Sequence, residues 1–142
     1  MMKHIVKTLS LSLLVAGTAV AEPEITIVGS DQFTWEKTPE GVAFAALDGA
    51  RFDTAYMAMV RLPAGTVSPP HVKSASMYGL MVKGTMTHVA HGEIEQAAQP
   101  IGPGAFYKIP AGLAHVSACI SDTPCETFLY QDGAFDFLPV SQ

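Results

Sequence analysis

The chain has 142 residues, 49% of them hydrophobic and 15% charged, which is enough for one hydrophobic core and too few for two. Its formal net charge is −5, and no basic run follows the first seven residues, which argues against nucleic acid or anionic lipid as a partner. The sequence has no nucleophile elbow, phosphate-binding loop, dinucleotide fingerprint or HExxH helix. The motifs that usually indicate a hydrolase or a nucleotide-binding protein are therefore not found in it.

Residues 1–21 predict a secretory signal peptide, which would leave 22–142 as a single domain. The segment begins with the basic MMKHIVK, continues with the mostly apolar TLSLSLLVAGTAV and ends in the small residues Ala19-Val20-Ala21. It is too short for a membrane-spanning helix, although a retained N-terminal anchor is the alternative. We therefore expect a periplasmic or secreted protein with no membrane attachment after cleavage.

The rest of the chain has no convincing stretch with the 3.6-residue apolar period of an amphipathic helix. It consists of short runs rich in β-forming residues, separated by Gly, Pro, Asp and Ser. In residues 54–62, strand alternation places Tyr56, Ala58, Val60 and Leu62 on one face. The pattern predicts an all-β sandwich or barrel, with strands at 25–28, 33–35, 42–47, 54–62, 78–82, 85–89, 101–109, 113–120, 127–130 and 135–140.

Two glycine-bounded segments carry the most specific pattern. The first, GTVSPPHVKSASMYGLMVKG at 65–84, holds His71, Lys73 and Met77 between its terminal glycines. The second, GAFYKIPAGLAH at 104–115, ends in His115. The spacing of glycines, proline and histidines resembles the two sequence motifs of the cupin superfamily. This resemblance implies the cupin-type double-stranded β-helix, a jelly-roll β-barrel.

The same resemblance implies a metal site inside the barrel. In the cupin pattern the first motif offers two histidines and a glutamate to the metal, and the second motif offers one histidine. His71 and His115 fall on ligand positions, whereas Lys73 stands where a histidine is usual and Met77 where the glutamate is usual. A thioether in place of a carboxylate softens the site, so we expect His71, Met77 and His115 to bind copper first, as Cu(I), with zinc, nickel or iron as alternatives. The alternatives are that the histidines hydrogen-bond each other or a water and that Met77 only packs the barrel.

Lys73, Tyr78 and Tyr107 are candidates for binding a small ligand. A protonated lysine offers no lone pair to a metal, but it suits an anionic ligand such as a carboxylate. The alternative for Lys73 is an ammonium that reaches solvent at the barrel rim. The tyrosines could serve as acid, base or ligand donors in the cavity, or they could pack with their hydroxyls at the rim.

Two cysteines, Cys119 and Cys125, flank the turn-like string ISDTP. In an exported protein this pair predicts a disulfide across a hairpin, and two thiolates binding a soft metal are the alternative. His88 and His91 could form an accessory metal patch, although ordinary surface histidines are the default interpretation.

The leading hypothesis is a periplasmic cupin that binds a metal ion or small ligand in a barrel pocket around His71 and His115. One alternative is a metal-dependent cupin enzyme, such as an oxygenase, lyase or isomerase, with a variant ligand set. The other is a metal-free cupin that acts as an interaction module, with a homodimer as the candidate assembly. Fold alone does not choose between them.

Overall fold

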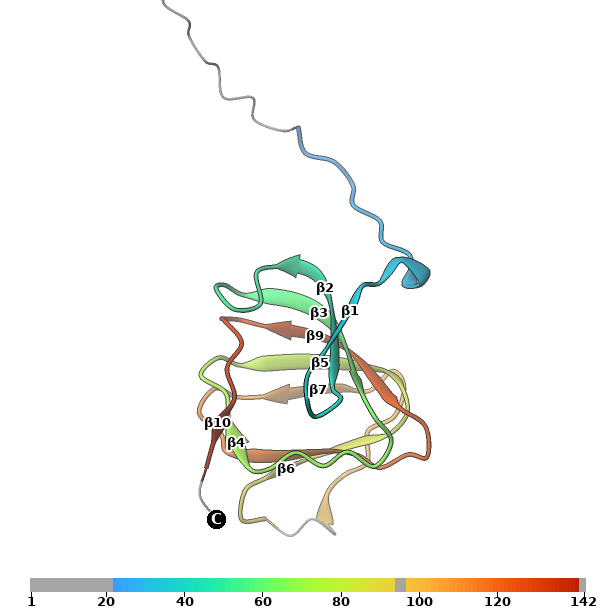
Figure 1. The fold of residues 1–142 in the computed structure, drawn as a ribbon. Coiled ribbons are helices and arrows are strands. Elements are labelled where there is room, and N and C mark those ends of the chain that lie inside the picture. Colours follow the sequence, from blue (N-terminus) through green and yellow to red (C-terminus); the bar gives the residue numbers. More distant parts are fainter. Residues whose placement is uncertain (1–21, 94–96, 141–142) are drawn as a thin grey trace, which may run out of the picture.

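The computed structural model describes residues 22–93 and 97–140, so the predicted signal peptide at 1–21 lies outside the described residues. Residues 22–29 extend away from the barrel and lead into a short 3₁₀ helix, η1 (Ser30–Gln32) (Figure 1). The strands that follow are β1 (Trp35–Lys37), β2 (Ala43–Gly49), β3 (Tyr56–Leu62), β4 (His71–Val72), β5 (Met77–Lys83), β6 (Met86–Ala90), β7 (Phe106–Ile109), β8 (His115–Cys119), β9 (Cys125–Gln131) and β10 (Leu138–Pro139).

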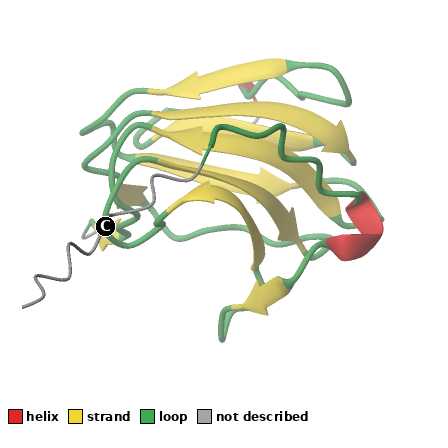
Figure 2. Cartoon of the chain, turned by 90° about the horizontal axis from the view of Figure 1, so that it is seen from above, coloured by secondary structure: helices red, strands yellow, loops and turns green. Residues whose placement is uncertain are grey.

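The strands form two antiparallel sheets around one interior. The larger sheet has the order β1-β2-β3-β9-β5-β7, and the smaller has the order β10-β4-β8-β6. Strands and loops make up almost all of the described chain, with η1 at one side (Figure 2). This arrangement confirms the predicted all-β jelly-roll barrel. No described helix has the length and hydropathy needed to cross a membrane.

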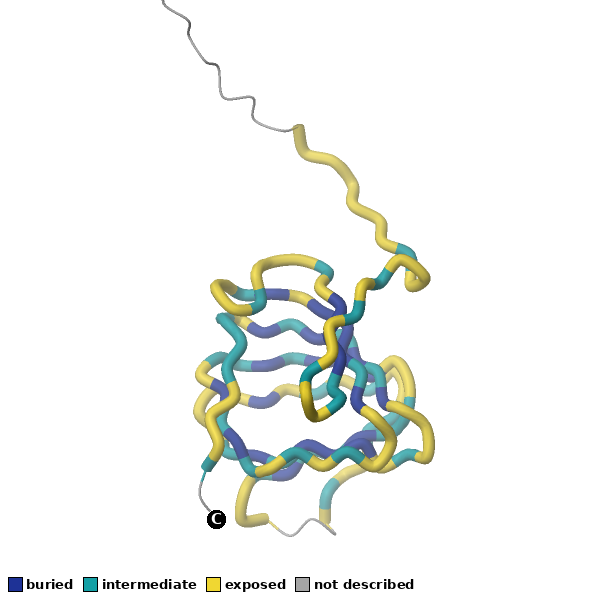
Figure 3. Tube along the Cα trace, viewed as in Figure 1, coloured by how far each residue is buried: buried dark blue, intermediate teal, exposed yellow. Residues whose placement is uncertain are grey.

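The hydrophobic core lies between the inner faces of the two sheets. Buried and more exposed residues alternate along the strands of the larger sheet, as strand geometry requires (Figure 3). The predicted face of β3 is confirmed, since Tyr56, Ala58, Val60 and Leu62 are all buried. Their partners across the β3–β9 ladder, Gln131, Leu129, Thr127 and Cys125, are buried as well, so both strands turn the same face inward.

Gly79 and Tyr107 occupy one space inside the barrel. They are directly paired across β5 and β7, so both face the interior. A Cβ atom added to Gly79 would lie 2.0 Å from Cζ and 2.3 Å from the hydroxyl oxygen of Tyr107. The absence of a side chain at Gly79 is therefore what allows the Tyr107 ring to lie flat against β5.

One predicted strand is absent, and the first motif segment is only partly a strand. Residues 25–28 form no strand, and the Ile25 and Ile27 side chains are 90% and 85% exposed, because no neighbouring strand pairs with this segment. Strand β4 does not continue from His71 to Met77. It ends at Val72, and the backbone N–H of Ser74 donates instead to the Asp136 carboxylate at 3.0 Å.

The predicted disulfide is present between Cys119 at the end of β8 and Cys125 at the start of β9. It closes a loop with a sequence separation of 6, with 5.8 Å between the two Cα atoms. Both thiols are therefore consumed, and the alternative of a thiolate metal site at these cysteines is wrong.

Candidate functional site

The two motif histidines meet on the inner face of the smaller sheet. His71 begins β4, His115 begins β8, and the two residues are direct partners in the ladder between these strands. Their ring centroids lie 4.2 Å apart with the planes inclined at 53°. His71 is 4% exposed and His115 is 1% exposed, so the pair is almost wholly screened from solvent. The stiff Pro69-Pro70 approach leaves His71 few backbone options and sets where β4 begins.

Backbone carbonyls fix the tautomer of both rings. The Nδ1 atoms lie 2.9 Å from the carbonyl oxygens of Pro69 and Leu113, for His71 and His115 respectively. A carbonyl oxygen can only accept, so each Nδ1 carries the proton and each Nε2 presents a lone pair. The Nε2 atom of His115 is buried and has no hydrogen-bond partner among the described residues. The pair therefore offers electron pairs to a cation or to a hydrogen-bond donor.

Both imidazoles are neutral at physiological pH. Burial lowers the pKa of His71 to about 4, with smaller contributions from the neighbouring His115 and Lys73, although the Pro69 carbonyl opposes this shift. Burial also lowers the pKa of His115, and the Leu113 carbonyl opposes it there. A neutral imidazole is the form that binds a metal ion, so the pair needs no deprotonation before binding.

Lys73 lies inside the barrel, only 4% exposed, so the alternative of an ammonium reaching solvent at the rim is wrong. Its Nζ donates to the backbone carbonyl of Asp136 and lies 3.8 Å from the ring centroid of Phe135. Burial lowers the pKa of Lys73 to about 8, with Asp136 acting in the opposite direction. The amine is thus engaged by its own chain, and its role toward a ligand stays a prediction.

Residues 132–137, between β9 and β10, form a strap that ends on the His71 ring. The Phe137 ring stacks on the His71 ring at 4.1 Å with an angle of 13° between the planes. Asp136 accepts from Ser74 through its carboxylate, and the Phe135 N–H donates to the Arg51 carbonyl at 2.6 Å. In Figure 1 this segment runs down one end of the barrel from β9 to β10, beside β4. An open hollow of about 520 Å³ lies against the strap, lined by Ser74, Ala75, Ser76, Ala111, Asp132, Gly133, Ala134, Phe135 and Asp136.

Met77 faces the interior from the opposite sheet. It begins β5 in register with Ile109 and Gln131, both buried, and it belongs to the main hydrophobic cluster of the barrel. Its role as a metal ligand stays a prediction.

The two tyrosines lie on opposite faces of the larger sheet. Tyr107 faces inward, its hydroxyl lies 3.2 Å from Oγ1 of Thr127, and burial raises its pKa to about 12. Tyr78 faces outward, with Lys108 Nζ 5.3 Å from its ring centroid and the Tyr130 ring 5.9 Å away. Tyr78 does not point into the interior, because Met77 points inward and the next residue of a strand points outward. Its role as a ligand-binding residue stays a prediction.

His88, which the default interpretation placed on the surface, belongs to the interior of the barrel. It pairs with Ser117 across β6 and β8, and its Nδ1 lies 2.8 Å from the Ser117 hydroxyl oxygen. Its ring centroid is 4.3 Å from that of Tyr107, and its Nε2 is buried without a partner among the described residues. Burial lowers the pKa of His88 to about 4, with His115 and His71 adding to the effect. His91 is exposed, so the two residues form no common surface patch.

The donor chemistry of the interior fits a transition-metal ion held by imidazoles, and it does not fit a hard ion. The His71–His115 pair offers imidazole nitrogens, which suit transition-metal ions, whereas Mg²⁺ and Ca²⁺ prefer oxygen ligands. Across residues 22–93 and 97–140, no three His, Cys, Asp or Glu side chains are placed to hold one ion as they stand. The described conformation therefore supplies two imidazole donors.

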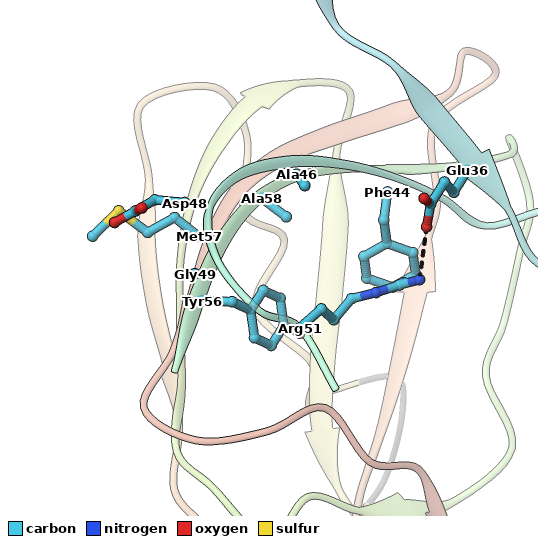
Figure 4. Close-up of a pocket in the computed structure, with 9 residues that line it drawn as sticks. All are labelled: Glu36, Phe44, Ala46, Asp48, Gly49, Arg51, Tyr56, Met57 and Ala58. Carbon is cyan, nitrogen blue, oxygen red and sulfur yellow. Dashed lines mark hydrogen bonds and ion pairs between the residues drawn. The ribbon is translucent and has the colours of Figure 1, made fainter. Parts of the chain in front are cut away.

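A second cavity lies at Arg51, between β2 and β3, and Figure 4 shows the Arg51 side chain extending past Phe44 toward Glu36. The guanidinium carbon is 4.3 Å from the Phe44 ring centroid, and Nη2 lies 3.3 Å from the Glu36 carboxylate. The cavity volume is about 20 Å³, which holds about one water molecule. This cavity is too small for an organic ligand.

The sequence model of the ChrR cupin-like domain matches residues 24–135. No curated protein matches the chain. Among solved structures, the chain is similar to the polyketide cyclase RemF from Streptomyces resistomycificus, with 20% identity over 84% of this chain and 87% of RemF and a TM-score of 0.64.

Two further structures are similar. For an RmlC-like cupin from Shewanella frigidimarina, the identity is 14% over 80% of this chain and 95% of the other, with a TM-score of 0.63. For KdgF from Halomonas sp., the identity is 18% over 75% and 94%, with a TM-score of 0.59. At these identities the likeness shows a shared fold and leaves the chemistry to the residues of the site.

Proposed function

The chain belongs to the ChrR cupin-like domain family, and we propose that it is an exported cupin that binds a transition-metal ion between His71 and His115. The observation that carries this proposal is the orphaned lone pair on Nε2 of His115, buried beside a second imidazole in the same tautomer. A buried lone pair with no donor among the described residues is satisfied by an electron-pair acceptor, and a d-block cation is one. A bound ion of this kind supplies Lewis acidity or, for copper and iron, electron transfer.

Copper is the first candidate because a thioether faces the same interior. Imidazole binds copper, zinc, nickel and iron alike, whereas the sulfur of Met77 would favour Cu(I). Lys73 supports the proposal through its own contacts: its amine is turned to the Asp136 carbonyl and the Phe135 ring. A protonated amine engaged in this way need not approach an ion at the imidazole pair.

Equilibrium dialysis of the purified chain against Cu(I), Zn(II), Ni(II) and Fe(II) tests the proposal. We expect wild type to bind at least one of these ions, and His71→Ala and His115→Ala each to weaken binding by about 100-fold or more, since one ligand loses the effective concentration given by the other. His91→Ala is the matched control, because His91 is exposed and should leave affinity unchanged. If wild type takes up none of the four ions, the metal-binding proposal is wrong.

Substitutions of Met77 identify the ion within the same assay. Met77→Leu keeps an apolar side chain in the core. It should lower the affinity for Cu(I) and leave the affinity for Zn(II) unchanged. Met77→Glu should shift preference toward harder divalent ions. Unchanged Cu(I) affinity in Met77→Leu would remove the thioether from the ligand set and leave the histidine pair in place.

The hollow against the strap supports a second candidate function. Its volume of about 520 Å³ lies within the range of small-molecule sites, so a ligand or substrate could bind in this hollow, against residues 132–136. Turnover that requires added metal would favour the enzyme hypothesis over a binding protein. Failure to bind either a metal or a small molecule would favour the interaction module.

Export is proposed from the sequence of residues 1–21, and the disulfide is consistent with an oxidising compartment. The intact mass of protein from its native cell should correspond to a chain that begins at Glu22. The same mass should be lower by two hydrogen atoms than that of the reduced chain. A mature chain that retains Met1 would contradict export with cleavage.

A further inference from the structure

The ligand set proposed above is short of donors. Of the four positions where the cupin pattern offers ligands, this chain keeps two imidazoles, at His71 and His115. A transition-metal ion in a protein usually takes three or four protein donors, and Lys73 supplies none because its amine is engaged by Asp136. A further nitrogen donor inside the barrel would therefore complete the site in a way that the motif spacing does not predict.

His88 is placed to be that donor. It lies on β6, whose neighbour in the smaller sheet is β8. Register puts His88 opposite Ser117 and Ala90 opposite His115, so His88 is a diagonal neighbour of His115 on the inner face. Diagonal neighbours on adjacent antiparallel strands are about 7 Å apart at Cα, a distance that two imidazole side chains can span together.

Two ring nitrogens in this interior are buried without partners. They are Nε2 of His88 and Nε2 of His115, and in both rings it is Nδ1 that makes the hydrogen bond. With Nδ1 of His71 held by the Pro69 carbonyl, all three histidines share one arrangement, an engaged Nδ1 and an Nε2 directed away from it. Buried polar atoms normally have partners, so each of these two nitrogens on neighbouring strands lacks one that the described residues do not supply.

We infer that His88 supplies a third imidazole nitrogen to the metal ion held by His71 and His115, an inference that rests on the function proposed above. The three side chains do not converge on one point as they stand, so His88 turns about its side-chain bonds when the ion binds. Ser117 and Tyr107 position the ring before that turn, through the contact to Nδ1 and the ring contact at 4.3 Å. His88 thereby supplies a donor that Lys73 does not.

Counting nitrogens on the bound ion tests this inference. In the Cu(II)-loaded chain, pulsed electron paramagnetic resonance should detect three coordinated imidazoles in wild type and two in His88→Ala. Cu(II) and Zn(II) affinities in dialysis should fall by about 10-fold or more in His88→Ala. His91→Ala, on the exposed residue just beyond β6, is the control and should keep three imidazoles and full affinity.

A measurement on wild type covers the case in which His88→Ala does not fold. Long-range ¹H–¹⁵N spectra report the state of each ring nitrogen, and Zn(II) should shift Nε2 of three histidines while His91 stays unchanged. Two imidazoles on the ion, together with wild-type affinity in His88→Ala, would overturn the role of His88 and leave the proposed function standing. Absence of any ion binding by wild type would instead overturn the proposed function, and this inference with it.

Discussion

Gly79→Ala should destabilise the barrel by about 3 kcal/mol or more, because the added Cβ would lie 2.0 Å from the Tyr107 ring. Neither partner can give way easily. Gly79 is held by ladders to both β7 and β9, and the Tyr107 hydroxyl is engaged with Thr127. Urea unfolding of the variant should show a much lower transition midpoint, or no folded baseline at all.

Gly102→Ala is the matched control for Gly79→Ala. A Cβ at Gly102 would meet no atom within 4 Å, and its φ lies outside the positive range, so we expect a change below about 0.5 kcal/mol. Tyr107→Ala provides a rescue test. In the Tyr107→Ala background the clash partner is gone, and Gly79→Ala should then change the free energy of unfolding by about 1 kcal/mol or less. Equal stability of Gly79→Ala and wild type would show that the Tyr107 ring does not occupy this space.

The free energy of unfolding should fall as the pH is lowered from about 6.5 to about 4. The pKa values of His71 and His88 are about 4 in the folded chain and about 6.5 in an unfolded one, so only the unfolded chain takes up protons in this window. Proton uptake by the unfolded state favours unfolding, and each histidine adds a slope of at most about 1.4 kcal/mol per pH unit. The stability that neutral burial contributes is therefore complete above pH 6.5 and lost toward pH 4.

Urea unfolding at a series of pH values between 7 and 4 measures this slope. His88→Phe keeps an aromatic ring against Tyr107 and removes one titrating group, so its pH dependence should be shallower than that of wild type. His91→Ala removes an exposed histidine and should leave the dependence unchanged. A free energy of unfolding that stays constant from pH 7 to pH 4.5 would contradict neutral burial of these rings.

Local sequence patterns predicted most of the strands of the barrel. They failed where the backbone conformation depends on a segment far away in the sequence. Alternation placed Tyr56, Ala58, Val60 and Leu62 on one face of β3, because it depends on residues close in sequence. The meeting of His71 and His115 is a long-range contact that followed from the resemblance to the cupin motifs. Residues 25–28 have the composition of a strand, but a strand also needs a neighbour, and none pairs with them here. The break after Val72 depends on Asp136, which lies 62 residues from Ser74 along the chain.

The candidate site was predicted less completely than the fold. In residues 85–89, apolar Val89 and polar His88 are adjacent, and alternation fixes which of the two faces inward only when the partner strand is known. Register with β8 settles it, since His88 opposes Ser117 on the face that carries His115. Strand alternation also explains why Tyr78 faces outward. Its neighbour Met77 faces inward, so Tyr78 lies on the opposite face of β5.

The strap also has a consequence for time scales. Phe137 covers the His71 ring and Lys73 holds the strap through the Asp136 carbonyl, so exchange of anything bound at the pair waits for residues 132–137 to lift. Affinity and lifetime are then set by different parts of the chain, affinity by the imidazoles and lifetime by the opening of the strap. Because the strap follows β9 in sequence, most of the barrel can form before this cover closes. An ion that enters during folding would be retained after its free concentration had fallen. The fraction of chains with a bound ion would then reflect the ion concentration at the time of folding.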